Sequence, residues 1–334
     1  MRTQYAPPHP SAMDDLDATR LNALAAKLAP GRDDRVSDLA RLSGGASQET
    51  WEFRLGDARF ILRRAPGGTL ERKSGAGLSI EAAVIAAVAA HAVPVPNVRH
   101  VLSPEDGLGL GFVVDFVEGE TIARKLIRDP AFADVRTHLA ADLGRILAAI
   151  HNVPVGALPP LRRLGPRATL DALREALDAC GAGRPVFELA LRWLRDRAPP
   201  EPQTLSLVHG DFRLGNLMVS AEGVRAVLDW ELVHLGDPME DLGWLCATPW
   251  RFGALEKPVG GVGMREDLFE AYGQVDARRA TWWEILASLR WGIICAGMAP
   301  LFASGIDRSV ERAMIARRAS ESEIDLLRLM QEHA

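Results

Sequence analysis

The spacing of apolar residues changes near Gly119, and this change constrains the fold more than any other feature of the sequence. Before Gly119, short apolar segments alternate with polar residues at the two-residue spacing of strands, and turns rich in Gly and Asp separate them. The pattern predicts strands at residues 39–42, 51–55, 59–64, 99–102 and 111–117, and a helix at residues 79–91. The order β, β, β, α, β, β predicts a small antiparallel sheet that carries one helix.

Beyond Gly119, apolar residues recur at the three- and four-residue spacing of amphipathic helices. We predict such helices at residues 131–151, 168–178, 184–197, 264–273, 276–302 and 307–332, and a short N-terminal one at residues 14–29. A chain of 334 residues exceeds the length at which one hydrophobic core keeps growing, so two core-bearing units are expected. The predicted division is an N-terminal arm and helix at 1–34, a sheet lobe at 35–118 and a helical lobe at 119–334.

Composition and charge narrow the class of protein. The net charge is -5, and the basic residues, nearly all arginine, form no dense runs, so nucleic acid is not an expected partner. Cys180, Cys246 and Cys295 lie far apart, which predicts neither a zinc site nor a disulfide framework. Residues 1–15 hold no apolar core for a secretory signal, and the apolar run 82–90 is shorter than the roughly 18 residues that span a bilayer. We therefore expect a cytoplasmic protein without a membrane span.

The segment 205–231 carries the most specific chemical signal. His209-Gly210-Asp211, followed five residues later by Asn216, matches the His-x-Asp-x-x-x-x-Asn pattern of kinase catalytic loops. Two short apolar runs around a turn at residues 221–223 predict a hairpin that brings Asn216 beside Asp229. The pattern predicts Asp211 as the catalytic base, with Asn216 and Asp229 as magnesium ligands.

These residue types suit phosphoryl transfer. The reaction needs an attacking oxygen held in line with the phosphorus, and developing charge neutralised by positioned cations. A carboxylate can orient the hydroxyl, and magnesium prefers carboxylate, amide, phosphate and water oxygens. In the alternative interpretation, Asp211 caps a turn, Asn216 lies in a loop and Asp229 begins a helix. The combined spacing favours the catalytic interpretation.

The 209–216 loop and the segment 228–231 resemble the aminoglycoside phosphotransferase and choline kinase-like superfamily. The similarity runs from about Val36 to Trp244 and includes the stretch 236–242. Within the superfamily, the chain is most similar to the kinase-like domains fused to acyl-CoA dehydrogenases. The resemblance implies an α+β, protein-kinase-like, two-lobed fold, ATP and Mg²⁺ as cofactors, and a hydroxyl group of a small molecule as phosphoryl acceptor.

Two backbone segments are expected to contact the nucleotide. The turn 43–47 would cover the phosphates with its amide groups, which nominates Ser43, Gly44, Gly45 and Ser47. It is neither a G-x-G-x-x-G loop nor a Walker A motif, so a plain hairpin turn is the alternative. By resemblance, backbone groups of the hinge residues Phe116, Val117 and Glu118 would meet the adenine edge, although an ordinary strand end fits the same pattern.

Arg63 occupies the strand position at which kinases carry a phosphate-binding lysine. Strand alternation places Ile61 on the same face, where it would line the adenine pocket while Arg63 contacts phosphate oxygens. Glu81, in the first turn of the next helix, would pair with Arg63. The alternatives are a solvated edge arginine, like Arg59 or Arg64, and a glutamate that compensates a helix dipole.

Several polar and aromatic residues are given supporting roles. By resemblance, Asp237 and Asp241 brace the 209–216 loop from behind, and His209 organises it. His151 and His234 are interpreted as structural. Five tryptophans would form either an aromatic wall for the acceptor or simply core: Trp244, Trp250, Trp282, Trp283 and Trp291.

Two competing functions are less well supported by the sequence. A metal-dependent hydrolase would use His209, Asp211, Asp229 and His234, but the H-E-x-x-H pattern is absent. A non-catalytic nucleotide-binding module is suggested by Arg63 alone. From residue 256 onward the chain has 12 acidic and 10 basic residues. Because a polycationic acceptor would favour an acidic binding surface, this near balance does not indicate one. The acceptor and the oligomeric state stay open.

Overall fold

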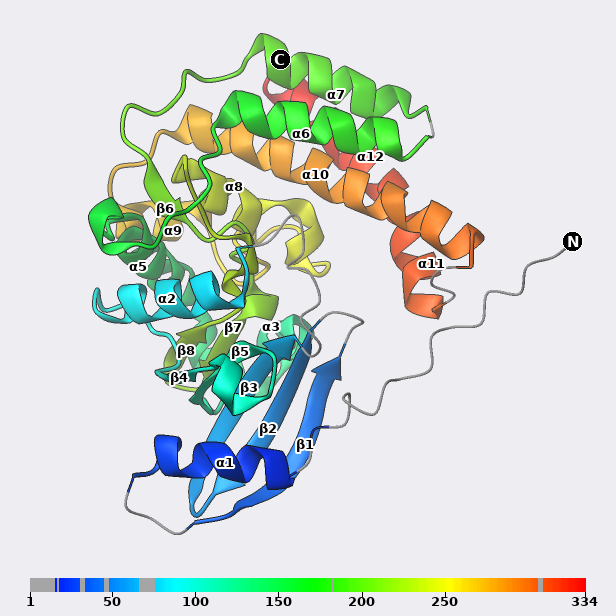
Figure 1. The fold of residues 1–334 in the computed structure, drawn as a ribbon. Coiled ribbons are helices and arrows are strands. Elements are labelled where there is room, and N and C mark those ends of the chain that lie inside the picture. The colour runs from blue at the N-terminus through cyan, green and yellow to red at the C-terminus, as the bar shows by residue number, and fades with distance from the viewer. Residues whose placement is uncertain are drawn as a thin grey trace, which may run out of the picture. The chain divides into compact units, whose positions relative to one another are not determined.

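The computed structural model of the protein describes residue 16 and residues 18–30, 34–44, 48–65, 76–181, 183–305 and 309–334. The chain divides into two compact units. Figure 1 shows the chain coloured by residue number, from blue at the N-terminus to red at the C-terminus. Unit 1 comprises Met1–Ala89 and Pro96–Val117, and unit 2 comprises Ala90–Val95 and Glu118–Ala334.

Unit 1 is built on a five-stranded sheet of order β1-β2-β3-β5-β4, in which all paired neighbours run antiparallel. Its elements are α1 (Ala18–Leu28), β1 (Val36–Gly44), β2 (Glu49–Leu55), β3 (Ala58–Ala65), α2 (Leu78–Ala89), β4 (Val98–Val101), η2 (Pro104–Asp106) and β5 (Leu110–Asp115). The predicted antiparallel sheet with a helix between its third and fourth strands is confirmed.

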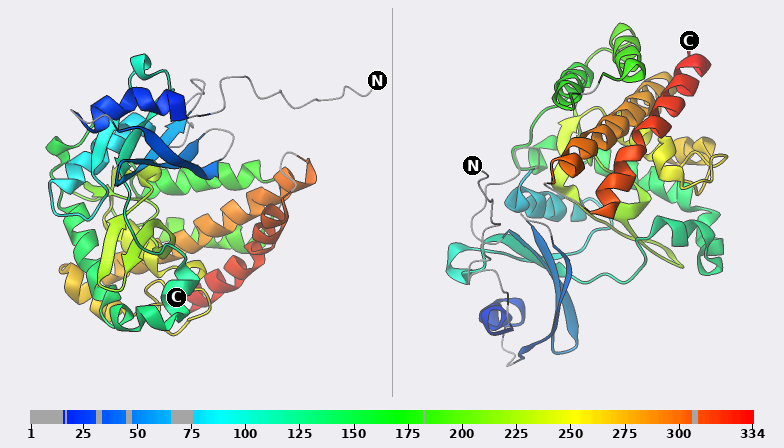
Figure 2. Two further views of the ribbon diagram at one scale, coloured as in Figure 1. Left: turned by 90° about the horizontal axis from the view of Figure 1, so that it is seen from below. Right: turned by 90° about the vertical axis from the view of Figure 1, so that its right-hand side faces the viewer.

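One face of this sheet is the core of unit 1. Phe60 and Leu62 of β3 join Phe53 and Leu55 of β2 in a buried cluster, because alternate strand residues share a face. The leucines of α1, Leu21 and Leu24, are fully buried in the same cluster. The right view in Figure 2 shows α1 beside the twisted strands. The N-terminal helix is therefore part of the core of this unit.

The interpretation of Arg64 as a solvated edge residue was wrong. β3 is the third of five strands, and the Arg64 side chain is only 2% exposed, with its Nε 2.9 Å from Glu49 Oε2. Arg59 is also engaged, since its guanidinium lies 3.4 Å from the ring centroid of Phe116. Both arginines therefore interact with neighbouring side chains of unit 1, as expected for residues of a central strand.

Unit 2 is mainly helical. Its first helices are α3 (Ala123–Arg128), α4 (Ala133–Arg136), α5 (Leu139–His151), α6 (Pro166–Ala179) and α7 (Pro185–Asp196), and the later ones are α8 (Met239–Cys246), α9 (Arg265–Tyr272), α10 (Ala277–Ala303), α11 (Val310–Arg317) and α12 (Ala319–Glu332). Short 3₁₀ turns are η3 (Pro130–Phe132), η4 (Val155–Ala157), η5 (Leu214–Asn216), η6 (Trp230–Leu232) and η7 (Thr248–Arg251). The helices predicted at 168–178, 184–197, 264–273 and 276–302 are confirmed as α6, α7, α9 and α10.

Two predicted helices are broken in the structure. The stretch 131–151 contains η3, α4 and α5, and the stretch 307–332 contains α11 and α12, which meet at Arg318. Apolar spacing continues across each bend, so periodicity alone does not locate the break. α8 was not predicted because all of its residues are buried, which leaves no polar face to give an amphipathic signal.

Two small antiparallel sheets lie within unit 2. β6 (Ser206–Val208) pairs with β9 (His234–Gly236), and β7 (Leu217–Ser220) pairs with β8 (Gly223–Val227). The β7–β8 hairpin is the one that the sequence predicts. The β6–β9 pair was not predicted, since each strand has only three residues.

α10 is the central helix of unit 2, and α6, α7, α8, α11 and α12 all contact it (Figure 1). It is long and apolar enough to cross a membrane by length and composition, with a mean hydropathy of 1.6 over 18 residues. Half of that window is buried inside the protein, as in the core helix of a globular domain. This helix, predicted at residues 276–302, is apolar over a longer stretch than the run 82–90.

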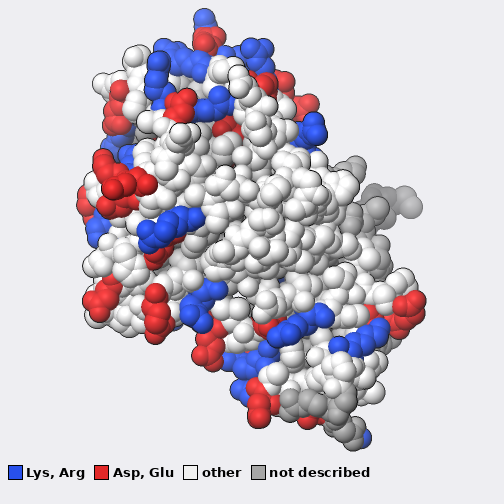
Figure 3. Space-filling model, turned by 90° about the vertical axis from the view of Figure 1, so that its left-hand side faces the viewer, with Lys and Arg blue, Asp and Glu red and all other residues white. Residues whose placement is uncertain are grey.

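On the face drawn in Figure 3, charged side chains of both signs are mixed around the margin, and a broad central area is largely uncharged. This agrees with a net charge of only -5 and with arginines distributed along the whole chain.

The contact between α8 and α10 predicts a specific defect. A Cβ added at Gly243 would lie 2.6 Å from the Glu284 nitrogen, a backbone atom of α10 that cannot move aside cheaply. We expect Gly243→Ala to lower the free energy of unfolding by about 2 kcal/mol. Gly156→Ala is the matched control, because a Cβ at Gly156 meets nothing within 4 Å. Urea denaturation measures both, and equal midpoints would contradict the close approach.

Candidate active site

The 209–216 loop connects β6 to β7 in unit 2. It leaves β6 through Gly210, whose φ of 81° lies in the left-handed region. A Cβ at Gly210 would also be 2.7 Å from the Leu232 carbonyl oxygen. Glycine is required here on both grounds, since other residues are strained at this φ and would clash. This turn presents Asp211 immediately after the strand.

Asp211 and Asn216 are joined directly. Asn216 Nδ2 donates to Asp211 Oδ2 at 2.7 Å and to the Asp211 carbonyl oxygen at 2.9 Å. These two bonds fix the amide plane. Within the described parts of the chain, Asn216 Oδ1 has no hydrogen-bond donor, so this amide oxygen is available to a cation.

Asp229 follows β8 at the other end of the hairpin. The Leu228 amide donates to the Asn216 carbonyl oxygen at 2.8 Å, which places Asp229 one residue beyond the partner of Asn216. Asp229 itself has φ 63° and ψ 67°. A non-glycine residue in this left-handed conformation is uncommon and is concentrated at functional sites. Asp211, Asn216 and Asp229 thus belong to one hairpin and its preceding loop.

A buried carboxylate, that of Asp241 on α8, holds the start of the loop. Its Oδ2 accepts from the His209 amide at 2.8 Å and its Oδ1 from the Gly210 amide at 2.9 Å. His151 Nε2 lies 3.1 Å from the same carboxylate. Burial by itself would raise the pKa of Asp241, but the hydrogen bond and charge of His151 hold that pKa below its usual value. The predicted bracing contact is present.

Asp237 contacts residues of α8 and α10. It accepts from the Met239 amide at 3.1 Å and from Trp283 Nε1 at 2.7 Å, and it pairs with Arg279. These contacts tie the start of α8 to α10. Asp237 therefore supports the helix that carries Asp241. Its hydrogen bonds and ion pair named here are made with residues outside the 209–216 loop, so its support of the loop is indirect.

The ring nitrogens of the histidines near the loop form hydrogen bonds within the protein. His209 Nε2 donates to the Leu228 carbonyl oxygen at 3.0 Å, and its Nδ1 accepts from the Asp211 amide at 3.2 Å. His234 Nε2 lies 3.1 Å from Glu240. Burial would lower the pKa of His234, but the Glu240 carboxylate raises it. The described residues contain no group of three or more His, Cys, Asp and Glu side chains arranged to hold a metal ion.

Arg213 and Arg290 were not predicted as site residues, and Trp244 was predicted only as a member of an aromatic wall or of the core. Trp244 Nε1 donates to Asp211 Oδ1 at 2.8 Å, Arg213 Nε donates to the same oxygen at 3.1 Å, and Arg290 Nη1 donates to the Gly210 carbonyl oxygen at 3.1 Å. Trp244 lies three residues after Asp241 on α8, so both face the loop. Of these contacts, only that of Arg213 could have been predicted from the sequence, because Arg213 lies two residues after Asp211.

In unit 1 the expected ion pair is present. Arg63 Nη1 donates to Glu81 Oε1 at 2.6 Å, and the Glu81 side chain is 1% exposed. Ile61 and Arg63 share the less buried face of β3. Both residues therefore lie on the side of the sheet opposite the core.

The backbone segments nominated for nucleotide contact are partly described. Ser43 and Gly44 pair with Thr50 and Glu49 at the end of β1, so they belong to the strand, while Gly45 and Ser47 lie outside the described residues. The Phe116 amide donates to the Arg59 carbonyl oxygen at 3.0 Å. Val117 is the last residue of unit 1, and Glu118 is the first residue of the longer segment of unit 2.

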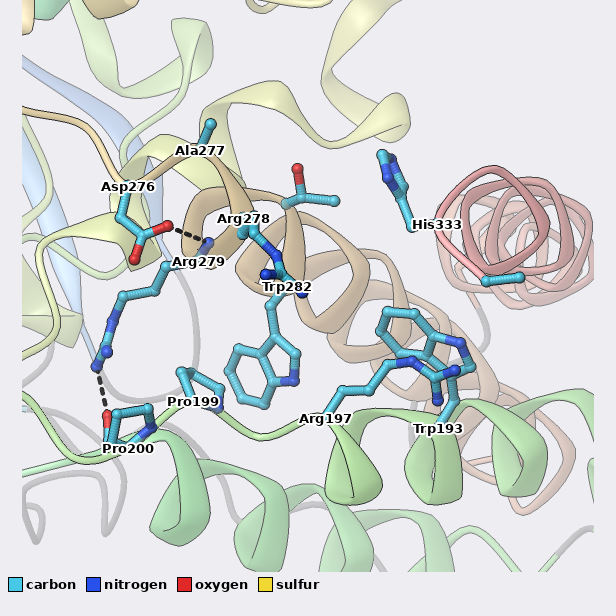
Figure 4. Close-up of a pocket in the computed structure, with 12 residues that line it drawn as sticks. Trp193, Arg197, Pro199, Pro200, Asp276, Ala277, Arg278, Arg279, Trp282 and His333 are labelled. Atoms are coloured by element: carbon cyan, nitrogen blue, oxygen red, sulfur yellow. Dashed lines mark hydrogen bonds between the residues drawn. The ribbon is translucent and has the colours of Figure 1, made fainter.

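A cavity of about 800 Å³ opens beside the first turns of α10 (Figure 4). Trp193 and Arg197 come from α7 and its end, and Arg278 and Trp282 come from α10. No residue of the 209–216 loop lines it. Arg279, at its edge, bonds the Pro200 carbonyl oxygen at 2.8 Å. This cavity is separate from the Asp211 site.

Comparison with solved structures identifies the fold. A protein of Ralstonia eutropha, provisionally named an aminoglycoside phosphotransferase, superposes with a TM-score of 0.74 at 20% identity, over 95% of this chain and 99% of that one. A thermostable mutant of another aminoglycoside phosphotransferase, in a ternary complex with AMP-PNP and hygromycin B, superposes with a TM-score of 0.61 at 19% identity, over 93% and 99%. The fold is that of the kinase-like phosphotransferases, as predicted.

Residues 38–283 match the phosphotransferase enzyme family, and the chain belongs to this family. Acyl-CoA dehydrogenase family member 10 of Mus musculus is 31% identical over 221 residues, which cover 63% of this chain. The matched part is 20% of that protein, so the chain spans about a fifth of the length of this relative. The predicted relationship to acyl-CoA dehydrogenase family proteins is confirmed.

The Asp241 network predicts both a loss of stability and its pH dependence. Asp241→Asn leaves one buried amide without an acceptor and removes the charge opposite His151, so we expect a loss of about 3 kcal/mol at neutral pH. The folded-state pKa lies below the unfolded value of about 3.9. The difference between the proteins is therefore full above that pH and shrinks as pH falls through the folded-state pKa.

Urea denaturation between pH 3 and 7 measures this effect. Asp267→Asn, at an exposed position of α9, is the control and should change stability little. A pH-independent difference between the wild-type protein and Asp241→Asn would contradict an ionised Asp241.

Proposed function

We propose that this protein transfers the γ-phosphoryl group of ATP, with Mg²⁺, to a hydroxyl group of a small molecule. Asp211 is assigned as the catalytic base, and Asn216 and Asp229 as the magnesium ligands. Unit 1 is assigned nucleotide binding and unit 2 catalysis and acceptor binding. A cytoplasmic location belongs to the same proposal.

The observation that carries the proposal is the fixed orientation of the Asp211 carboxylate. Oδ2 accepts from Asn216, and Oδ1 accepts from Trp244 and Arg213. The side chain is still 16% exposed, so an acceptor hydroxyl can reach it. Catalysis of phosphoryl transfer consists largely of such positioning, because the transition state needs little covalent assistance.

The donor set suits magnesium. Asn216 offers an amide oxygen that no described donor occupies, and Asp229 offers a carboxylate at the end of the same hairpin. Bound magnesium would neutralise charge on the transferred phosphoryl group. Two protein oxygens suffice, because magnesium commonly keeps water and phosphate oxygens as its other ligands.

The nucleotide would be held by the residues nominated in unit 1. Arg63 is oriented by Glu81 and its side chain is 21% exposed, and a guanidinium is suited to binding phosphate oxygens. Ile61 lies on the same face and would pack on adenine. Because the Phe116 amide is used by Arg59, the adenine contacts are assigned to the Phe116 carbonyl and to the backbone of Val117 and Glu118. Ser43, Gly44, Gly45 and Ser47 are assigned to the phosphates.

The competing functions fit less well. A metal-dependent hydrolase would need His209 and His234 as ligands, and both imidazoles are engaged elsewhere. A non-catalytic module would not need a carboxylate held by three side-chain donors. The AMP-PNP bound to the aminoglycoside phosphotransferase of the same fold supports ATP as the phosphoryl donor.

We expect Asp211→Asn to reduce kcat by about a hundredfold to ten-thousandfold, because the general base is removed while its shape is kept. Coupled ADP release with Mg²⁺ and a panel of alcohols, sugars and amino alcohols measures this. Asp134→Asn, at an exposed position in α4, should retain wild-type turnover. Acceptor-dependent turnover that survives Asp211→Asn would remove Asp211 from the mechanism.

We expect Arg63→Met to raise the Kd for Mg·ATP about tenfold, because a charge-assisted contact with phosphate is lost. Arg63→Lys keeps the charge and should remain closer to wild type. Arg54→Met, on the neighbouring strand β2, is the control, since Arg54 pairs with the exposed Asp38. Calorimetry measures all three, and an unchanged Kd in Arg63→Met would place this guanidinium away from the phosphates.

A further inference from the structure

Three tryptophans and three arginines form a continuous group in unit 2, here called the tryptophan–arginine wall. Its members are Trp244, Trp250, Trp291, Arg213, Arg290 and Arg318. The indole centroids are 5.1 Å apart between the first and second tryptophan and 4.9 Å apart between the second and third. Each indole carries one guanidinium, at centroid distances of 4.5 Å for Arg290, 4.9 Å for Arg213 and 5.4 Å for Arg318.

The wall begins at the catalytic carboxylate. Trp244 and Arg213 both donate to Asp211 Oδ1, and Arg290 donates to the carbonyl oxygen of the preceding residue, Gly210. The side chains of Arg213 and Arg290 are 28% and 20% exposed. A molecule that offers a hydroxyl to Asp211 therefore lies against these two guanidiniums.

The wall has more hydrogen-bond donors than acceptors. In the described structure, Arg213 uses only its Nε, which leaves both terminal amino groups for a ligand. Arg290 uses only Nη1 in its hydrogen bond and ion pair. A guanidinium stacked on an indole keeps its N–H edge directed outward, where it can bind a carboxylate or phosphate with two bonds.

The two guanidiniums of the wall near Asp211 have one carboxylate each beside them. Arg213 Nε lies 3.1 Å from Asp211 Oδ1, and Arg290 Nη1 lies 3.6 Å from Glu240, which also pairs with His234. Burial lowers the pKa of Arg162, and so does the neighbouring Arg290 cation, while the Glu240 carboxylate raises it, so the Arg162 and Arg290 guanidiniums are close enough to repel one another. An anion placed against Arg290 would relieve this repulsion, whereas a cation would add to it.

We propose that the phosphoryl acceptor is an anionic alcohol, a small molecule that carries a carboxylate or a phosphate besides its hydroxyl. Arg213 and Arg290 bind the anionic group, and their stacking on Trp250 and Trp244 holds the two guanidiniums in place. This inference rests on the proposed phosphotransferase function. In the reaction, the acceptor oxygen forms a bond to the γ-phosphorus, the bond to the bridging oxygen of ADP breaks, and the hydroxyl proton passes to Asp211.

The test uses short alcohols of equal length that end in a carboxylate, a phosphate, a neutral amide or a quaternary ammonium group. We expect kcat/KM for the carboxylate or the phosphate to exceed that for the amide by about tenfold to a hundredfold. The two anionic arms distinguish the chemistry of the anion. The proposal is overturned if the amide or the quaternary ammonium compound is used as well as both anions.

Arg213→Gln and Arg290→Gln test the assignment to these side chains. Each should reduce the ratio of anionic to neutral kcat/KM by about tenfold, and Arg290→Lys should recover part of it. The ratio is internal to each protein, so a fraction of misfolded enzyme does not change it. Arg192→Gln, on α7 with its side chain 83% exposed, is the control and should leave the ratio unchanged. Ratios unaffected by both Arg213→Gln and Arg290→Gln would overturn the proposal.

Calorimetry with the same alcohols separates this inference from the proposed function. If no alcohol is phosphorylated but the anionic ones bind more tightly, and Arg290→Gln abolishes the difference, the anion site stands and the phosphotransferase function fails. If phosphorylation occurs without preference for an anion, the function stands and the anion site fails. Equal binding of all four alcohols counts against the anion site.

Discussion

The buried carboxylate of Asp241 determines how the 209–216 loop leaves β6. It accepts hydrogen bonds from two consecutive backbone amides, those of His209 and Gly210, and His151 keeps it charged. Two consecutive amides cannot be satisfied by the short β6–β9 ladder beyond Val208, and a buried unpaired amide is costly. The bend that presents Asp211 therefore depends on one side chain from a helix more than thirty residues downstream.

α8 organises the site because two of its residues, Asp241 and Trp244, face the same loop. Asp241 holds the loop backbone, and Trp244 holds the carboxylate of Asp211. The helix is in turn fixed against α10 by the close approach at Gly243. α10 also contributes Arg290, which reaches the Gly210 carbonyl oxygen. The same two helices, α8 and α10, therefore support the fold of unit 2 and hold the side chains around Asp211, so a packing defect at Gly243 would also disturb these contacts.

The sequence allowed the sheet of unit 1, the β7–β8 hairpin and most of the long helices to be predicted, because each has a local periodicity or a turn signal. It also nominated Asp211, Asn216 and Asp229, since one loop and one hairpin bring them together. It could not locate the breaks in the stretches 131–151 and 307–332, where apolar spacing continues across a bend. It missed α8, whose complete burial removes the pattern on which such predictions depend.

The sequence by itself determined the family, the kinase-like fold and the residues of the 209–216 loop, because these follow from spacing along a short segment. Only the tertiary structure decided what surrounds Asp211. Trp244 and Arg290 come from two other helices, and their contacts with the loop depend on how α8 and α10 pack. Arg213 is close in sequence, yet its stacking on Trp250 is a long-range contact. Side chains that converge from separate elements leave no periodic signal, so the surroundings of Asp211 had to come from the fold.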